Sequence, residues 1–263
     1  MVDPATAIEK ARQTVSQRAE LPGMSRMEHL DELRRRIVHA AAYLAVGFAV
    51  AYVFHERLYG FIQEPLDRLH IKLNYTHPMD ALNLYLQVSL IGGAILASPF
   101  ILYQVWLFIA PGLYQKERRF VIPFMGATVG LFLAGAAFGY FYVLPGALKI
   151  LILDFGKKFN PIVTIEEYTG FFLSIILGLG ISFELPILIF FLALFGIVSP
   201  QFLWKNIRYA ILAVFLVSAI ITPSPDPWTM CIYAIPMLCL YLIGIGVAWW
   251  VHPSHRKSKE AAS

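Results

Sequence analysis

The sequence is poor in charge and in cysteine. Only 14% of its 263 residues are charged, against roughly 25% in an ordinary soluble domain, and 58% are hydrophobic. A water-soluble globule of this length cannot bury that much apolar surface, so the composition excludes a cytosolic enzyme and a nucleic-acid-binding protein. Cys231 and Cys239 fall in one apolar run, too far apart along a helix to bridge each other, which excludes a disulfide scaffold.

The motifs of common catalytic and metal sites are missing as well. The sequence has no phosphate-binding glycine loop and no HExxH pair, and its seven histidines are scattered. The segment Gly180–Glu184 lacks the closing glycine of a nucleophile elbow. The sequence therefore predicts a protein that is not an enzyme and that has no cofactor and no metal site.

Long apolar runs are what the sequence does contain. A spanning helix needs about 20 apolar residues, and charges mark the ends of such helices because they are costly in hydrocarbon. The pattern predicts an all-α polytopic membrane protein with six transmembrane helices in a domain over 27–252, between a polar leader (1–26) and a basic tail (253–263). We expect the fifth and sixth helices to be short. The expected spans are about 37–55, 83–108, 120–144, 168–196, 208–223 and 228–249.

Basic residues are distributed unequally between the two sides of this arrangement. Of the 21 Lys and Arg residues, 15 fall on the side of the amino terminus, and the other six fall in the loops around 55–80 and 145–168 on the opposite side. Cytoplasmic loops are enriched in Lys and Arg. The sequence therefore predicts a multi-pass protein of the plasma (inner) membrane with both termini in the cytoplasm.

One acid, Glu184, falls inside the fourth apolar run. An intramembrane acid costs at least about 2.5 kcal/mol on insertion scales, so it must face protein or a wet cavity. Pro186 removes a backbone donor and predicts a distortion near Ser182. Two interpretations stay open: a hydrogen-bonded structural acid, or an acid that faces a ligand or responds to protons. A small proton-coupled secondary transporter using Glu184 is the alternative function, disfavoured because the two halves share no repeat.

Two clusters beside the apolar runs carry charge that packing does not explain. Residues 27–36 have Leu30 and Leu33 at helical spacing and predict an amphipathic segment that leads into the first span. Its basic residues suit a membrane anchor, but a pure anchor does not require its acids. The turn 108–119 follows the second span, and Glu117 is its only acid, for which a weak surface ion pair is the plain alternative.

These segments together resemble the TatC family, the polytopic subunit of the twin-arginine protein translocase. The resemblance extends over about residues 27–250 and depends on five segments in the same order. They are His29–Arg36, Glu64-Pro65-Leu66, Pro99–Tyr114 followed by Glu117-Arg118-Arg119, Ser182–Pro186, and Thr222-Pro223 with Asp226-Pro227.

The resemblance implies a core receptor that binds twin-arginine signal peptides of folded precursors at the cytoplasmic face. It implies assembly with TatA- and TatB-type single-span proteins, room for self-association, and export driven by the proton-motive force. Carboxylates pair bidentately with guanidinium groups, which suits this function. By resemblance, the peptide-binding residues are Glu32, Glu117, Phe108, Arg34, Arg118 and Arg119, Glu184 is the acid of a concave groove for the signal's apolar segment, and Pro65 and Asp226 are outer-side hinges.

Overall fold

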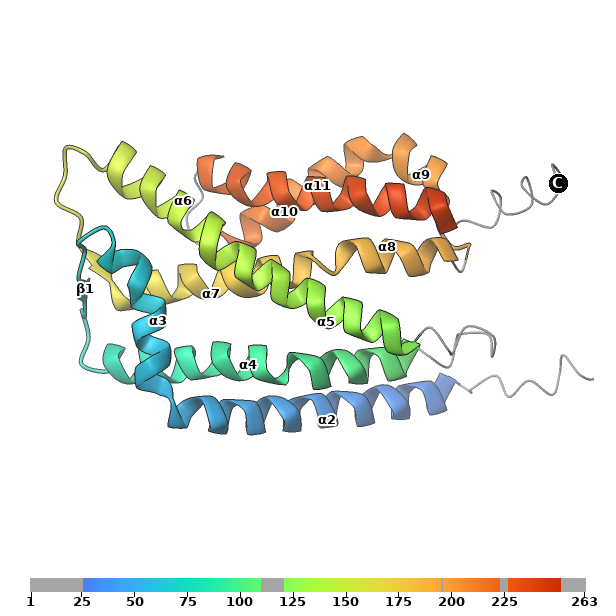
Figure 1. Ribbon diagram of the computed structural model, residues 1–263, viewed down its shortest axis with the longest axis horizontal. Helices are drawn as coiled ribbons and strands as arrows, with labels where there is room; N and C mark the ends of the chain where they lie inside the picture. Colours follow the sequence, from blue (N-terminus) through green and yellow to red (C-terminus); the bar gives the residue numbers. More distant parts are fainter. Residues whose placement is uncertain (1–25, 110–120, 195, 223–226, 252–263) are drawn as a thin grey trace, which may run out of the picture.

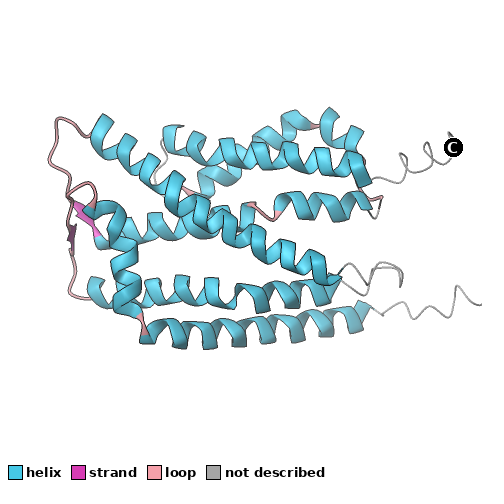
Figure 2. Ribbon diagram, viewed as in Figure 1, coloured by secondary structure: helices cyan, strands magenta, loops and turns pink. Residues whose placement is uncertain are grey.

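The computed structural model describes residues 26–109, 121–194, 196–222 and 227–251. Within these ranges the regular elements are helices apart from two short strands, which confirms the all-α class (Figures 1 and 2). The elements are α2 (Arg26–Val53), α3 (His55–Asp67), β1 (Leu73–Asn74), α4 (Asp80–Ile109), α5 (Val121–Phe138), η3 (Gly139–Val143), α6 (Leu144–Leu148), η4 (Lys149–Phe155), β2 (Val163–Thr164), α7 (Ile165–Ser182), α8 (Leu185–Leu194), α9 (Pro200–Lys205), α10 (Ile207–Ile221) and α11 (Pro227–Val251), where η marks a π-helical stretch.

Five helical segments in the described ranges are long and apolar enough to cross a membrane, and α10 is a shorter apolar helix of 15 residues. The short fifth helix was expected, but the sixth, α11, has 25 residues and is longer than predicted. Its apolar sequence simply continues from Pro227 to Val251. The long segments are Leu30–Val53, Asp80–Phe108, Phe124–Phe155, Ile165–Leu194 and Pro227–Val251.

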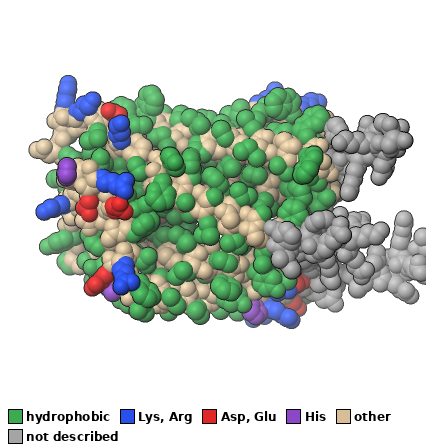
Figure 3. Space-filling model, viewed as in Figure 1, with side chains coloured by type: hydrophobic (Ala, Val, Ile, Leu, Met, Phe, Trp, Pro, Cys, Tyr) green, Lys and Arg blue, Asp and Glu red, His purple; other side chains and the backbone are tan. Residues whose placement is uncertain are grey.

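The helices share two ends, which we name by what lies there. At the terminal end, on the right in Figure 1, α2 begins, α4 ends, α5 begins and α11 ends. At the opposite end, the α3 end, helix α3 runs across the helical layer and β1 pairs in parallel with β2. Charged side chains gather at both ends and leave an apolar belt between them (Figure 3). Such a belt is what a bilayer core requires.

The third span differs from its prediction. It was expected to close near Pro145, yet the helical rod continues through η3, α6 and η4 to Phe155. Pro145 lies in the first turn of α6, directly after the wider π-helical turn Gly139–Val143. A proline lacks the backbone donor that an ordinary α-helical turn uses, but the first turn of a helix tolerates it. The proline is therefore accommodated inside the rod.

Helix α3 occupies part of the loop predicted over 55–80. Its residues Leu58, Ile62 and Leu66 recur at helical spacing, and the last two are buried against the core. Two tyrosines fasten it there: the Tyr168 hydroxyl donates to the Ile62 carbonyl at 2.6 Å, and the Tyr140 hydroxyl donates to the Phe61 carbonyl at 2.9 Å. These hydrogen bonds tie α3 to η3 and α7.

Pro65 lies in the last turn of α3 and is buried. It was expected in an outer loop, and the structure corrects that placement to a helix. Its role as a hinge stays a prediction. Asp226, the other predicted hinge residue, lies outside the described residues.

Glu64 should make the stability of the α3 end depend on acid pH. Its carboxylate accepts from Arg68 Nη2 at 2.7 Å and from the Tyr140 hydroxyl at 3.1 Å. The Arg68 hydrogen bond, followed by that of Tyr140, lowers the pKa of Glu64 below its usual range. A lowered folded-state pKa stabilises the fold above the unfolded-state value of about 4.3, and this stability is lost as the pH falls through the folded-state value.

We therefore expect acidification from about pH 6 to about pH 3 to lower the unfolding midpoint of the detergent-solubilised protein more than that of Glu64→Gln. Thermal unfolding followed by circular dichroism at each pH measures both slopes. Glu56→Gln is the control, because Glu56 is an exposed acid of the same helix with no ion pair among the described residues. A Glu64→Gln slope equal to that of the wild type would contradict the prediction.

Candidate functional site

A buried polar cluster joins α2 to α4 at the terminal end. Glu32 and Arg36 lie one turn apart on α2, and Arg36 Nη2 donates to Glu32 Oε1 at 2.9 Å. Arg36 Nη1 also donates to Gln104 Oε1 on α4 at 3.2 Å. The side chains of Glu32 and Arg36 are only 16% and 23% exposed. The cluster therefore holds a carboxylate in a fixed position beside the surface.

The cluster is incompletely satisfied. Glu32 Oε2 and Arg36 Nε are buried, and neither has a hydrogen-bond partner in the described part of the chain. A buried polar atom left without a partner costs about 1–3 kcal/mol. This carboxylate oxygen can therefore accept a hydrogen bond once a cationic donor displaces the groups that cover it, and a guanidinium offers donors in the geometry that a carboxylate prefers.

The predicted site residues fall into three groups in the structure. Phe108 lies one turn beyond Gln104 on α4 and is half-buried, so the structure brings it to the same end as Glu32. Arg34 is exposed and lies two residues from Glu32, a spacing at which helical side chains do not face each other. The structure does not bring Arg34 into the cluster. Glu117, Arg118 and Arg119 lie outside the described residues, so their roles stay predictions.

Arg36 and Gln104 were missed as site residues. Arg36 was detectable, because an acid and an arginine four residues apart on a helix form an ion pair. Gln104 is an amide inside a long uncharged run, and burial of an amide requires a partner. What the sequence could not show is that the partner belongs to another helix, since that depends on how α2 packs on α4.

Trp106 fixes the terminal end of α4. It is buried, and its Nε1 donates to Thr128 Oγ1 on α5 at 3.1 Å. Its ring also packs edge-on against Phe191 of α8, with centroids 4.4 Å apart. These contacts hold the end of α4 and the start of α5 together, and so fix the two points from which the segment 110–120 departs.

Glu184 lies at a break in the fourth span. Helix α7 ends at Ser182 and α8 begins at Leu185, so the distortion predicted from Pro186 is confirmed. Ser182 is satisfied locally, since its Oγ donates to the Gly178 carbonyl at 2.6 Å. Glu184 Oε1 is buried and has no hydrogen-bond partner among the described residues. The structure therefore places a second unsatisfied carboxylate, this one within the apolar belt.

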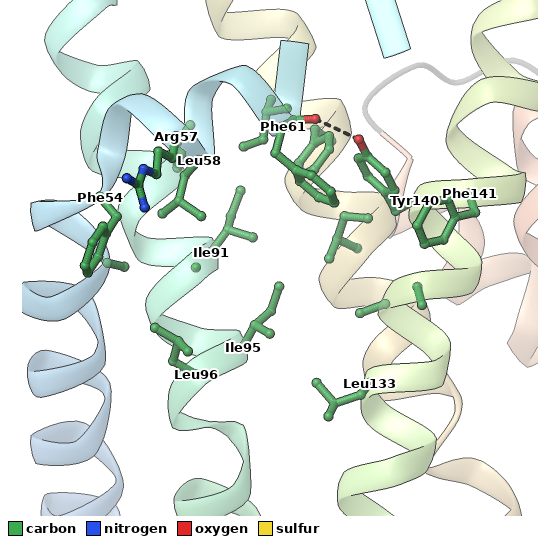
Figure 4. Close-up of a pocket in the computed structure, with 18 residues that line it drawn as sticks. Phe54, Arg57, Leu58, Phe61, Ile91, Ile95, Leu96, Leu133, Tyr140 and Phe141 are labelled. Atoms are coloured by element: carbon green, nitrogen blue, oxygen red, sulfur yellow. Dashed lines mark hydrogen bonds between the residues drawn. The ribbon is translucent and has the colours of Figure 1, made fainter. Parts of the chain in front are cut away.

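Two apolar grooves lie between the helices. The α3 groove, of about 580 Å³, lies between α4 and α5 beneath α3 (Figure 4). The α10 groove, of about 600 Å³, lies between α7, α10 and α11. Glu184 lines neither groove, so its assignment as the acid of a groove stays a prediction.

The described residues hold no group of three or more His, Cys, Asp or Glu side chains that could bind a metal ion. Among the described residues, the buried side-chain atoms without a partner are Arg36 Nε, the Tyr233 hydroxyl and two single carboxylate oxygens, at Glu32 and Glu184. The two carboxylates are the acidic acceptors of this set. Such groups suit recognition of a cation or a hydrogen-bond donor.

Comparisons with known proteins find relatives over most of the chain. The family model described as Sec-independent protein translocase protein (TatC) matches residues 28–236. A TatC protein of Koribacter versatilis (strain Ellin345) is 52% identical, covering 99% of this chain and 96% of the relative. One of Desulforapulum autotrophicum is 41% identical, covering 83% of this chain and 82% of the relative. A crystal structure of a twin-arginine translocase receptor, TatC, superposes with a TM-score of 0.79 and 36% identity, covering 85% of this chain and 99% of that one.

Proposed function

The chain belongs to the TatC family of Sec-independent protein translocase proteins, and from this premise we propose that it binds twin-arginine signal peptides through Glu32 at the terminal end. As a translocase component it is a multi-pass membrane protein with a non-enzymatic role. The observation that carries the proposal is the buried Glu32 Oε2, which has no donor among the described residues.

Arginine suits this carboxylate better than lysine does. A guanidinium presents a planar fork of donors, whereas an ammonium is a compact and strongly hydrated point charge. Arg36 already occupies Glu32 Oε1, and Gln104 holds Arg36 from the other side. An incoming arginine can thus use the free oxygen while the bound one keeps the carboxylate oriented.

The remaining members of the binding surface are proposed on the family resemblance. Glu117 supplies a second carboxylate for the second arginine, and Phe108 supplies an aromatic wall that attracts a cation. Arg34, Arg118 and Arg119 raise the positive charge of this end. A peptide that is merely basic is repelled by that charge unless its donors match the carboxylates.

We propose that the terminal end faces the cytoplasm and that the protein lies in the plasma (inner) membrane. The leader 1–26, the loop 110–120 and the tail 253–263 all adjoin this end, and 15 of the 21 Lys and Arg residues fall on its side of the membrane. Signal peptides of folded precursors then meet Glu32 before they enter the membrane.

Single-span partners of the TatA and TatB type are proposed to dock in the α10 groove. Small residues line it on both sides, among them Ser174 and Gly178 of α7 and Ala210 and Ala213 of α10. Small residues let helix backbones approach closely within a membrane, where packing drives association. Helix α10 also exposes apolar side chains, and a partner helix would cover them.

Glu184 is proposed to act with the apolar segment of the signal after recognition at the surface. A proton-coupled transporter, the alternative considered from the sequence, has less support because the family match extends through Glu184 and treats it as part of the translocase domain. Its unsatisfied Oε1 leaves a carboxylate available to a peptide within the apolar belt.

Binding of labelled signal peptides to the detergent-solubilised protein tests the proposed function. Fluorescence anisotropy compares a peptide with Arg-Arg against the same peptide with Lys-Lys. We expect the Arg-Arg peptide to bind at least about tenfold more tightly, which corresponds to about 1.4 kcal/mol. A peptide with the apolar segment alone is the control for nonspecific partitioning. Equal affinities for Arg-Arg and Lys-Lys would overturn the proposal.

A further inference from the structure

The α3 groove is a long apolar trough between two helical walls. Ile91, Ile95 and Leu96 of α4 line one side, and Leu133 of α5 lines the other (Figure 4). Its volume of about 580 Å³ lies within the range of ordinary ligand pockets, roughly 300–1,000 Å³. Leu96 and Leu133 are also exposed on the outside of the bundle, so the groove opens within the apolar belt.

A smaller cleft of about 250 Å³ adjoins the groove at the α3 end. Tyr140 and Phe141 line both the groove and the cleft, so the two hollows are neighbours that share these side chains. The cleft holds two cationic side chains, Arg68 of α3 and Lys149 of η4, and its lining contains no acid among the described residues. We call it the basic cleft.

The charges of the basic cleft are only partly neutralised. Arg68 pairs with Glu64 at 2.7 Å, yet its side chain is 69% exposed and its guanidinium has further donors. Lys149 is exposed and has no ion pair or hydrogen bond within the described ranges. Arg57, at the rim of the groove, lies 5.9 Å from the Phe54 ring centroid and has no carboxylate partner in the described part of the chain. The end of the trough is therefore net positive.

From the position of the basic cleft beside the apolar groove we propose that the two together bind one anionic phospholipid. An acyl chain fills the α3 groove, and the phosphate lies between Arg68 and Lys149. The two halves of the site match the two halves of such a lipid, because apolar surface favours the chain and clustered Lys and Arg bind the headgroup. An arginine fork and a lysine point charge are both established phosphate ligands.

A lipid fits this site better than the apolar segment of a signal peptide does. Such a segment carries no anion for Arg68 and Lys149, and its neighbouring arginines would be repelled by them. The basic cleft also lies at the opposite end of the helices from Glu32. The proposal is therefore independent of the proposed function, since it concerns a different end of the molecule and a different ligand.

Native mass spectrometry of the full chain in detergent tests the proposal. The probes are phosphatidylglycerol, phosphatidylcholine with the same acyl chains, and inorganic phosphate. We expect one phosphatidylglycerol to bind about tenfold or more tightly than phosphatidylcholine. Lys149→Gln should remove most of that preference, because the headgroup loses its unpaired cation. Lys158→Gln, which changes an exposed lysine near the same end but outside the cleft, should leave it unchanged.

A second variant tests the groove. Leu133→Trp places a large side chain in the trough and should weaken binding of both phospholipids several-fold. Circular dichroism and the unfolding midpoint show that each variant is folded, without reference to peptide binding. The failure of this proposal is thus separable from the failure of the proposed function.

Three results would overturn the proposal. One is equal binding of the two phospholipids together with no effect of Lys149→Gln. Another is inorganic phosphate binding that depends on Lys149 while Leu133→Trp leaves lipid binding intact, which would assign the cleft to a free anion. The third is a wild-type protein that binds no lipid but takes up the apolar segment of a signal peptide, with uptake blocked by Leu133→Trp.

Discussion

Glu32→Gln is expected to weaken binding of an Arg-Arg signal peptide by about 30-fold or more. Truncating one partner of a partly buried charge pair costs at least about 2 kcal/mol, which is about 30-fold in affinity. The substitution keeps the size of the side chain but removes the charge that a guanidinium requires. Fluorescence anisotropy with the detergent-solubilised protein measures the loss directly.

Asp31→Asn is the matched control for this prediction. Asp31 is the neighbouring acid on α2 and is exposed, so the substitution removes the same charge from the same helix without touching the cluster. We expect its affinity for the peptide to stay within about twofold of the wild type, because exposed charges interact weakly through solvent. Equal losses in both variants would mean that total charge, and not Glu32, sets the affinity. An unchanged affinity in Glu32→Gln would remove Glu32 from the site.

The sequence alone could single out Glu32 as a candidate, whereas it could not predict what surrounds Glu32. An acid in a basic segment that leads into a span stands out, because a membrane anchor does not require it. Its burial depends on Arg36 and on Gln104, which is 68 residues away from Arg36 along the chain. That contact follows from the packing of α2 on α4. Local spacing could have indicated the intrahelical pair, but no local rule brings the amide to it.

The fold, too, could be predicted from the sequence only in part. Runs without charge predicted where the spans lie because hydrocarbon excludes charge wherever it occurs. Outside the spans no such exclusion of charge marks where a helix lies. Helix α3 was therefore missed, although Leu58, Ile62 and Leu66 have helical spacing. The third span was expected to end at about residue 144, just before Pro145, but the effect of a proline depends on the turn that precedes it.

The glycines of the third span show the same dependence on tertiary packing. Gly126 and Gly130 form one GxxxG pair and Gly135 and Gly139 another, a spacing that permits close helix contact within a membrane. Gly135 and Gly139 do so, because a Cβ at Gly135 would lie 2.7 Å from the Leu179 carbonyl oxygen on α7. A Cβ at Gly126 or Gly130 would meet nothing within 4 Å among the described residues. Identical spacing therefore has different consequences on the two halves of one helix.

Gly47 and Gly93 allow a close backbone approach between α2 and α4. A Cβ at Gly47 would lie 2.5 Å from the Gly93 carbonyl oxygen, and one at Gly93 would lie 2.5 Å from the Phe48 amide nitrogen. Both neighbours are backbone atoms, which cannot move aside as a side chain can. Helix α2 packs almost entirely on α4, so this one crossing sets how α2 sits on the rest of the molecule.

Gly47→Leu is therefore expected to destabilise the fold by about 3 kcal/mol and to weaken peptide binding as well. The new side chain forces α2 away from α4. The Arg36–Gln104 hydrogen bond lies about 16 Å from Gly47 along α2 and depends on the distance between the two helices. Chemical unfolding followed by circular dichroism and anisotropy with the Arg-Arg peptide measure the two losses on one sample.

Gly130→Leu makes the same substitution on α5 where a side chain meets open space. It should leave peptide affinity unchanged and raise stability by up to about 1 kcal/mol, because leucine favours a helix more than glycine does. A Gly47→Leu protein that is destabilised yet binds normally would show that Glu32 acts without Gln104. The informative result is that Gly47→Leu loses both stability and peptide binding, whereas Glu32→Gln loses peptide binding alone. This result would mean that the α2–α4 crossing holds the carboxylate in place for the arginine.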